Sequence, residues 1–199
     1  MRALRTLVLL LSLLALSLAA AGCGGDDGGG DDNGNRSAAA APEIWAASVC
    51  GALGNWVTGL QNGSRELGTQ MRDTKDVENV KARFVSFLED AEQGSEEMVE
   101  KVKEAGPPDV EQGEAIQEDL VAALEKVNES FSKAVDRAND LSTSSLQSFS
   151  KGVGDLSEDV QNNLATTGQD FSTLSDRFQS TELDNAMDGE PACQQFKNG

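Results

Sequence analysis

From Pro42 onward, apolar side chains recur every three or four residues, which is the period of an amphipathic α-helix. No stretch alternates apolar and polar residues as a half-buried strand would. The helical period persists through most of the remaining chain, so the sequence predicts a single all-α domain over residues 42–199.

Start and stop signals divide this pattern into four stretches. The first opens at Pro42, whose fixed φ suits the first helical position, and Asn62-Gly63 predicts an interruption. The second is expected to open at Asp73 or Thr74 and to end before Gly106 and the two prolines that follow it.

The third stretch is expected to open with Asp109 and Gln112, which have the spacing of a capping box. A run of Ser and Thr over 142–145 predicts a turn, and Ser144 with Gln147 has the capping spacing for a fourth helix. The expected core faces are Trp45, Val49, Leu53, Trp56 and Leu60; Val77, Val80, Phe84, Phe87, Leu88, Ala91, Met98 and Val102; Ile116, Leu120, Leu124, Val127, Phe131, Ala134, Ala138 and Leu141; and Leu146, Phe149, Val153, Leu156, Val160, Leu164, Phe171, Leu174 and Phe178.

Four amphipathic helices joined by short connections predict an up-down-up-down four-helix bundle. The alternative is a long three-helix coiled coil, because the helical spacing nearly survives the Ser/Thr run. In that case residues 109–180 would form one rod about 100 Å long.

The N-terminal segment has the layout of a secretory signal peptide over residues 1–22. Arg2 and Arg5 precede an apolar run over 7–21, followed by Gly22 and Cys23. As a helix this run is about 22 Å long, which is short for a permanent span of roughly 30 Å.

The tetrapeptide Ala20-Ala21-Gly22-Cys23 resembles the lipobox of bacterial lipoproteins, although Ala20 stands where that motif usually has Leu. The resemblance covers these residues and their flanks. It implies that Cys23 is diacylglycerylated, becomes the mature N-terminus and anchors the protein to the extracytoplasmic face of the cell membrane. Two or more acyl chains give stable anchoring. The alternative is ordinary signal-peptidase cleavage, which would leave Cys23 as a free thiol in a secreted protein.

Residues 23–41 comprise Cys23 and an expected disordered linker rich in Gly and Asp. As a flexible coil the linker reaches roughly 24 Å. Its four aspartates, Asp26, Asp27, Asp31 and Asp32, lack the alternating ligands and terminal Glu of a calcium-binding EF-hand loop, so a solvated spacer is favoured.

If Cys23 is lipidated, Cys50 and Cys193 remain as an even pair in an exported chain, and a structural disulfide between them is expected. In an up-down-up-down bundle, the first helix starts at the end where the fourth finishes, which brings the two cysteines together. Redox chemistry is disfavoured, because there is no Cys-x-x-Cys motif and no His to lower a thiol pKa.

Composition excludes several functions. The chain has 34 acidic and 16 basic side chains and no His, with a net charge of -18. Leaving out the four linker aspartates and the three arginines before residue 42 gives a domain charge of -17. Such a polyanion is not expected to bind nucleic acid. Without His, and with carboxylates off the apolar faces, neither a catalytic site, a metal site nor a cofactor is expected.

The first helix carries one candidate recognition residue, Trp45. Its place on the apolar stripe favours core packing, and the alternative is an exposed recognition aromatic beside the linker. The spacing Trp45-x3-Val49-Cys50-x5-Trp56 also resembles that of small helical lipoproteins of high-GC Gram-positive bacteria, a likeness that implies no activity.

These features together predict a non-enzymatic, membrane-anchored lipoprotein whose bundle acts as an interaction or scaffolding module. The expected partner is an envelope protein, which the acidic surface would favour if it is cationic. The alternative is a carrier or sensor of an apolar ligand, suggested by the Phe-rich faces and by glycines within the helices. A carboxylate-based enzyme is the least favoured hypothesis.

Overall fold

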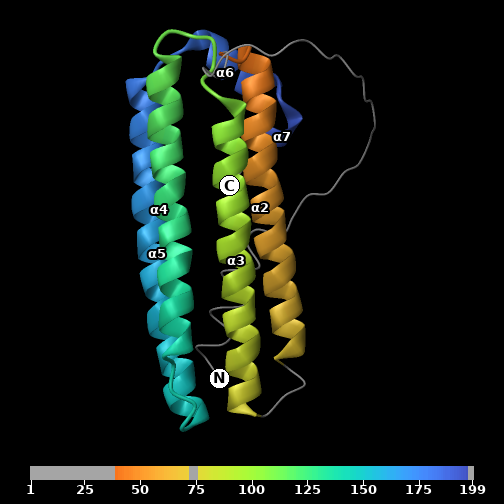
Figure 1. The fold of residues 1–199 in the computed structure, drawn as a ribbon, viewed down its shortest axis with the longest axis vertical. Coiled ribbons are helices and arrows are strands. Elements are labelled where there is room, and N and C mark those ends of the chain that lie inside the picture. The colour runs from red at the N-terminus through yellow and green to blue at the C-terminus, as the bar shows by residue number, and fades with distance from the viewer. Residues whose placement is uncertain (1–38, 72–75, 197–199) are drawn as a thin grey trace. The chain divides into compact units, whose positions relative to one another are not determined.

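The computed structural model describes residues 39–71 and 76–196, in which the only regular secondary structure is helical. The helices are α2 (Pro42–Gln70), α3 (Val77–Ala105), α4 (Gly113–Asn139), α5 (Leu146–Arg177), α6 (Thr181–Gly189) and α7 (Pro191–Gln194). The four long helices alternate in direction (Figure 1). This confirms the all-α bundle, and the rod over residues 109–180 is wrong because α4 and α5 are separate helices.

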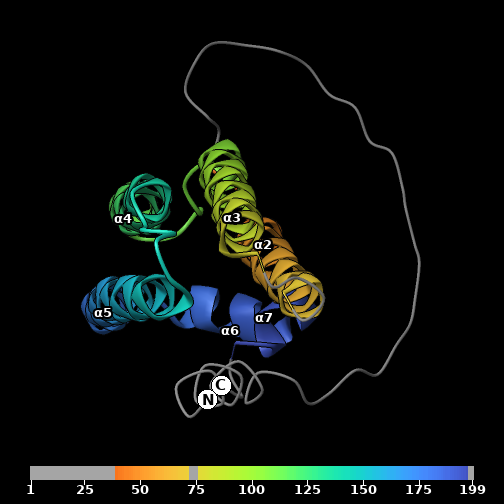
Figure 2. The same ribbon diagram turned by 90° about the horizontal axis from the view of Figure 1, so that it is seen from below.

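Each long helix packs mainly on its neighbours in sequence. α3 lies against α2 and α4, and α4 lies against α5, whereas α6 and α7 pack on α2 (Figure 2). Within the described residues, the backbones of α2 and α5 make no comparably close approach. Their side chains still share core clusters. Leu67 of α2 packs against the cluster that contains Leu156 of α5, and Leu60 and Leu164 pack against the cluster that contains Phe131.

The core contains the side chains that the helical spacing predicts. Trp56 and Phe131 meet edge to face, with ring centroids 5.9 Å apart. Leu146 is an exception, because it is the first residue of α5 and is 64% exposed. The side chains of Phe171 and Leu174 lie outside the described residues. The largest core cluster is built on Trp45, Val49, Ala52, Met98, Val99, Val102, Ile116, Leu120, Leu124 and Leu183.

Two expected signals at the ends of α2 and α3 differ from the structure. The interruption at Asn62-Gly63 is wrong, because α2 continues to Gln70. A Cβ at Gly63 would lie 3.1 Å from the Phe87 ring, so this glycine provides room for α3. Asp73 and Thr74 lie outside the described residues. α3 begins at Val77, where the Asp76 side chain accepts a hydrogen bond from the Glu78 N–H.

The starts of α4 and α5 are also shifted from their predicted positions. The capping box at Asp109 is wrong, since Gln112 is in the left-handed conformation and makes no side-chain cap. The Ser/Thr turn is confirmed, but the cap is Ser145, whose Oγ accepts the Ser148 N–H at 3.2 Å. Gly106, with φ of 66°, ends α3 where the sequence predicted.

Two helical glycines provide a matched test of the packing. A Cβ at Gly113 would lie 1.9 Å from the Pro108 carbonyl oxygen, whereas a Cβ at Gly154 would meet nothing within 4 Å. We expect Gly154→Ala to raise the free energy of unfolding by about 0.5–1 kcal/mol. Gly113→Ala should lower the free energy of unfolding by about 1–3 kcal/mol, because the backbone at Pro108 would have to move to make room for the new Cβ. Urea unfolding followed by circular dichroism measures both changes, and equal shifts would contradict the close contact at Gly113.

Candidate functional site

The lipidation site predicted at Cys23 lies outside the described residues, as do Asp26, Asp27, Asp31 and Asp32. In residues 39–71 and 76–196, no helix combines the length and apolar composition needed to cross a membrane. The same part of the chain holds no group of three or more His, Cys, Asp or Glu side chains placed to bind a metal ion. The bundle's surface and its buried polar groups provide the remaining candidates for a functional site.

Cys50 and Cys193 form a disulfide, with their Cα atoms 5.0 Å apart and 143 residues between them in sequence. Both sulfurs are buried beside Ala46 and Ala186. The bond ties α7 to the first half of α2, at the end of the bundle where the C-terminal segment crosses (Figure 1). The pairing agrees with the prediction made from the topology.

The segment preceding α2 is attached to the loop between α3 and α4. The Ala40 N–H donates to the Pro107 carbonyl oxygen at 2.8 Å, and the Asp109 N–H donates to the Ala40 carbonyl oxygen at 2.7 Å. This short parallel bridge places Ala40 within the folded domain rather than in the linker. It also engages Asp109, which was predicted to cap α4.

Trp45 is only 3% exposed, so it is not an exposed recognition aromatic. Its indole Nε1 donates to Gln117 Oε1 at 2.9 Å, and Gln117 Nε2 donates to the Val102 carbonyl oxygen at 2.6 Å. The two bonds join α2, α4 and α3 through one buried amide. Core packing of Trp45, the favoured interpretation, is therefore confirmed. Its hydrogen bond to Gln117 was not predicted.

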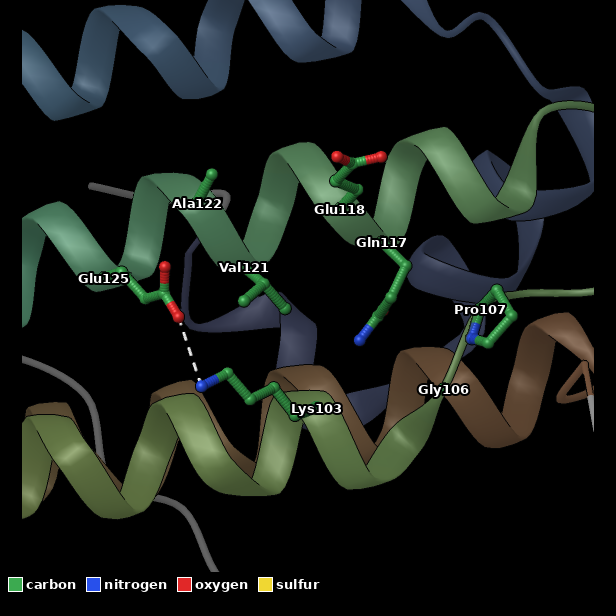
Figure 3. A pocket seen from close by; sticks show the side chains of 8 residues that line it. All are labelled: Lys103, Gly106, Pro107, Gln117, Glu118, Val121, Ala122 and Glu125. Atoms are coloured by element: carbon green, nitrogen blue, oxygen red, sulfur yellow. Dashed lines mark ion pairs between the residues drawn. The ribbon is translucent and has the colours of Figure 1, made fainter. Parts of the chain in front are cut away.

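The same amide forms part of the floor of a surface groove between α3 and α4 (Figure 3). We refer to this hollow of about 470 Å³ as the α3–α4 groove. One wall comes from the end of α3 and the following loop, and the other from the first half of α4. The lining residues are Lys103, Gly106, Pro107, Gln117, Glu118, Val121, Ala122 and Glu125.

The electrostatics of the groove are dominated by Lys103 and the carboxylates around it. Lys103 Nζ lies 3.1 Å from Glu125 Oε1 and 3.2 Å from Glu100 Oε1. Hydrogen bonds from the ammonium to Glu125 and then to Glu100 raise the pKa of Lys103 above its usual value. Glu118 lines the same groove and makes no ion pair within the described part of the chain.

Glu118 is one of the carboxylates that the sequence places off the apolar faces, and no role was predicted for Gln117. Glu118 is indeed exposed, and its side chain extends away from α3 (Figure 3). Gln117 did leave a signal, because it follows Ile116 on the apolar side of α4 and precedes Leu120 by three residues. A polar residue on such a stripe predicts a buried hydrogen-bonded group.

Comparisons of the chain with protein-family models, with curated proteins and with solved structures found no match.

The Trp45–Gln117 hydrogen bond can be tested by a double-mutant cycle. We expect Trp45→Phe to lower the free energy of unfolding by about 2–4 kcal/mol, because it removes indole contacts and leaves Gln117 Oε1 buried without a donor. Combination with Gln117→Met should reveal a coupling energy of about 1–2 kcal/mol in urea unfolding. Trp56→Phe is the control, because Trp56 Nε1 has no hydrogen-bond partner. An equal loss in the control would argue against the proposed contribution of the hydrogen bond.

The disulfide predicts a second stability effect. Cys50→Ser combined with Cys193→Ser should lower the free energy of unfolding by about 2–5 kcal/mol, because a long loop is released in the unfolded chain. Thermal melts with and without dithiothreitol provide the measurement. Reductant should destabilise the wild type and leave the double variant unchanged. Identical midpoints for wild type and double variant would show that the crosslink adds nothing to stability.

Proposed function

We propose that this protein is a membrane-anchored lipoprotein of the cell envelope whose helical bundle binds another envelope protein. The observation that carries the proposal is the combination of a lipobox-like sequence ending at Cys23 with a bundle closed by the Cys50–Cys193 disulfide. A disulfide of this kind is typical of exported domains, because the cytosol keeps thiols reduced.

The distribution of charge supports a binding role rather than catalysis. Every described Asp and Glu side chain is at least partly exposed, and the described buried polar side chains are Ser95, Gln117, Ser130 and Thr167. General acid–base chemistry relies on carboxyl groups whose pKa is shifted toward neutrality by burial or close like charges. A hydrogen bond from Lys133 lowers the pKa of the Glu129 carboxyl and so favours its charged form.

The aromatic core argues for the interaction module over a carrier of apolar ligands. Phe84, Phe131 and Phe149 are buried, and Phe131 packs edge to face on Trp56. Phe84 packs in a cluster with Leu88 and Leu156, and Phe131 in another with Val127, so the Phe-rich faces are used in packing the helices. No observation on the described chain favours the carrier hypothesis over this use.

The anchoring half of the proposal predicts a specific modification. Expressed in a bacterium that processes lipoproteins, the protein should partition into detergent and carry lipid on an N-terminal peptide beginning at Cys23. Cys23→Ser should lose both the lipid mass and the partitioning, because the acylated thiol is gone. Intact-protein and peptide mass spectrometry provide the measurement.

Two controls accompany that experiment. Cys50→Ser combined with Cys193→Ser should keep the lipid, since those thiols lie in the bundle. Ala20→Leu should be processed at least as completely as the wild type, because it restores the residue usual in a lipobox. A wild-type chain that is cut elsewhere and carries no lipid would refute anchoring. Crosslinking in intact cells tests the binding half, which fails if no envelope protein is crosslinked to the bundle of the wild type.

A further inference from the structure

The C-terminal part of the described chain forms a small unit, which we call the latch (residues 180–196). It consists of α6 and α7 and the residues that cap them, and both helices pack on α2. Only three of its side chains are buried, those of Leu183, Ala186 and Cys193. Helices of nine and four residues are too short to be stable alone, so the latch depends on its attachment to α2.

The hydrogen bonds that shape the latch are local. Ser180 Oγ accepts the Leu183 N–H at 3.3 Å and caps α6. Gln194 Nε2 donates to the Asp188 carbonyl oxygen at 2.6 Å, which joins α7 to α6. These bonds hold the two short helices together without joining them to α2. The covalent attachment to α2 is the disulfide.

α6 also covers this disulfide. Ala186 belongs to the same buried cluster as Cys50 and Cys193, and Met187 packs against that cluster. The two cysteines are 1% and 2% exposed, so a dissolved reductant does not reach their sulfurs while α6 is in place. Leu183, three residues before Ala186, is buried in the largest core cluster and anchors α6 on the bundle. Access to the bond therefore requires α6 to lift from α2.

The four long helices have packing of their own that does not involve the latch. One core cluster joins α3, α4 and α5 through Phe84, Ala134 and Leu156, and a second includes side chains of α2. The buried hydrogen bond from Trp45 to Gln117 joins α2 to α4 as well. Because these contacts remain when α6 and α7 leave, the latch can open as a local unit while the bundle stays folded.

We propose that the Cys50–Cys193 disulfide is a redox switch: a protein dithiol reduces it and releases the latch, while the four long helices stay folded. One thiol of the dithiol loses its proton and attacks the Cys193 sulfur, and the Cys50 sulfur leaves and takes up a proton. The second thiol loses its proton and displaces the Cys193 sulfur, which is protonated in turn. The products are two cysteine thiols and the oxidised dithiol. The cysteines are not redox catalysts here, because their bond is the substrate of the dithiol.

Release of the latch uncovers one face of α2. Ala46, Cys50 and Gly54 follow one another at intervals of four residues on this helix, and all three are buried in the closed state. A Cβ at Gly54 would lie 2.1 Å from Gln195 Nε2, so the latch lies directly on this row of small residues. The reduced form exposes the row and a free thiol. This control of the α2 surface goes beyond the proposed binding function and does not depend on lipidation of Cys23.

The test compares the oxidised and reduced forms of the mature full chain in mild detergent by hydrogen–deuterium exchange. Dithiothreitol is the reductant, and alkylation of the peptides containing Cys50 and Cys193 reports the extent of reduction. In the reduced form, amides of residues 181–196 should exchange within about threefold of the rates of an unfolded chain. Amides of residues 84–102 and 116–138 should stay protected at least about hundredfold. Oxidised glutathione should restore both the bond and the protection of residues 181–196.

Two matched variants test the route to the bond. Leu183→Ala removes the anchor of α6 and should raise the rate of reduction by dithiothreitol at least about fivefold. Leu156→Ala removes the same atoms from a buried position on α5, outside the latch, and should change that rate less than about twofold. Cys50→Ser combined with Cys193→Ser should show fast exchange in residues 181–196 without reductant and no response to it.

Several results would overturn the switch. Protection of residues 181–196 after complete reduction would show that the latch stays closed without the bond. Loss of protection throughout residues 84–102 and 116–138 would show that reduction unfolds the bundle. Equal acceleration by Leu183→Ala and Leu156→Ala would show that the bond is reached only through global unfolding. A reduced chain that does not close again in oxidised glutathione would show that the change is not a reversible switch.

Discussion

The Cys50–Cys193 disulfide is the constraint on which the closure of the bundle depends. In the described chain, α2 packs on α3 and on the short helices α6 and α7, and its backbone does not approach α5 closely. The first and last parts of the domain are therefore joined mainly through α6, α7 and the bond between Cys50 and Cys193. Without that bond, α7 would contribute little of its own, because a helix of four residues has no intrinsic stability.

The C-terminal segment that the disulfide holds on α2 also contributes a side chain to the core. Leu183 of α6 joins the cluster of Trp45, Met98 and Leu124, so the crossing segment covers one end of the core. Trp45 is buried there and needs a partner for its N–H, which Gln117 provides from α4. Gln117 in turn satisfies the Val102 carbonyl oxygen near the end of α3. A buried amide with two partners on two other helices favours one relative arrangement of the three.

The sequence was sufficient for features governed by periodicity and by chain direction. The apolar stripes, the end of α3 at Gly106 and the Cys50–Cys193 pairing all follow from local spacing combined with an antiparallel topology. Features governed by tertiary contacts were missed. Asn62-Gly63 resembles a stop signal, but Gly63 instead makes room for Phe87 across the helix interface.

Other misses have the same physical origin. Asp109 has the spacing of a helix cap, but its N–H is used by Ala40, which is 69 positions away and gives no local signal. The Ser180 and Glu190 side chains cap the short helices α6 and α7 by accepting hydrogen bonds from backbone N–H groups. Both helices also pack on α2, and this contact between distant parts of the chain gives no local signal in the sequence. The α3–α4 groove was not predictable, because it combines residues of one helix with a loop whose path is fixed by Ala40.

The position of Ala40 connects the segment just before α2 to the α3–α4 groove. The loop that binds Ala40 through Pro107 and Asp109 is the loop that supplies Gly106 and Pro107 to the groove wall. Because the two hydrogen bonds at Ala40 fix the path of this loop, they also fix the positions of Gly106 and Pro107 in the groove wall.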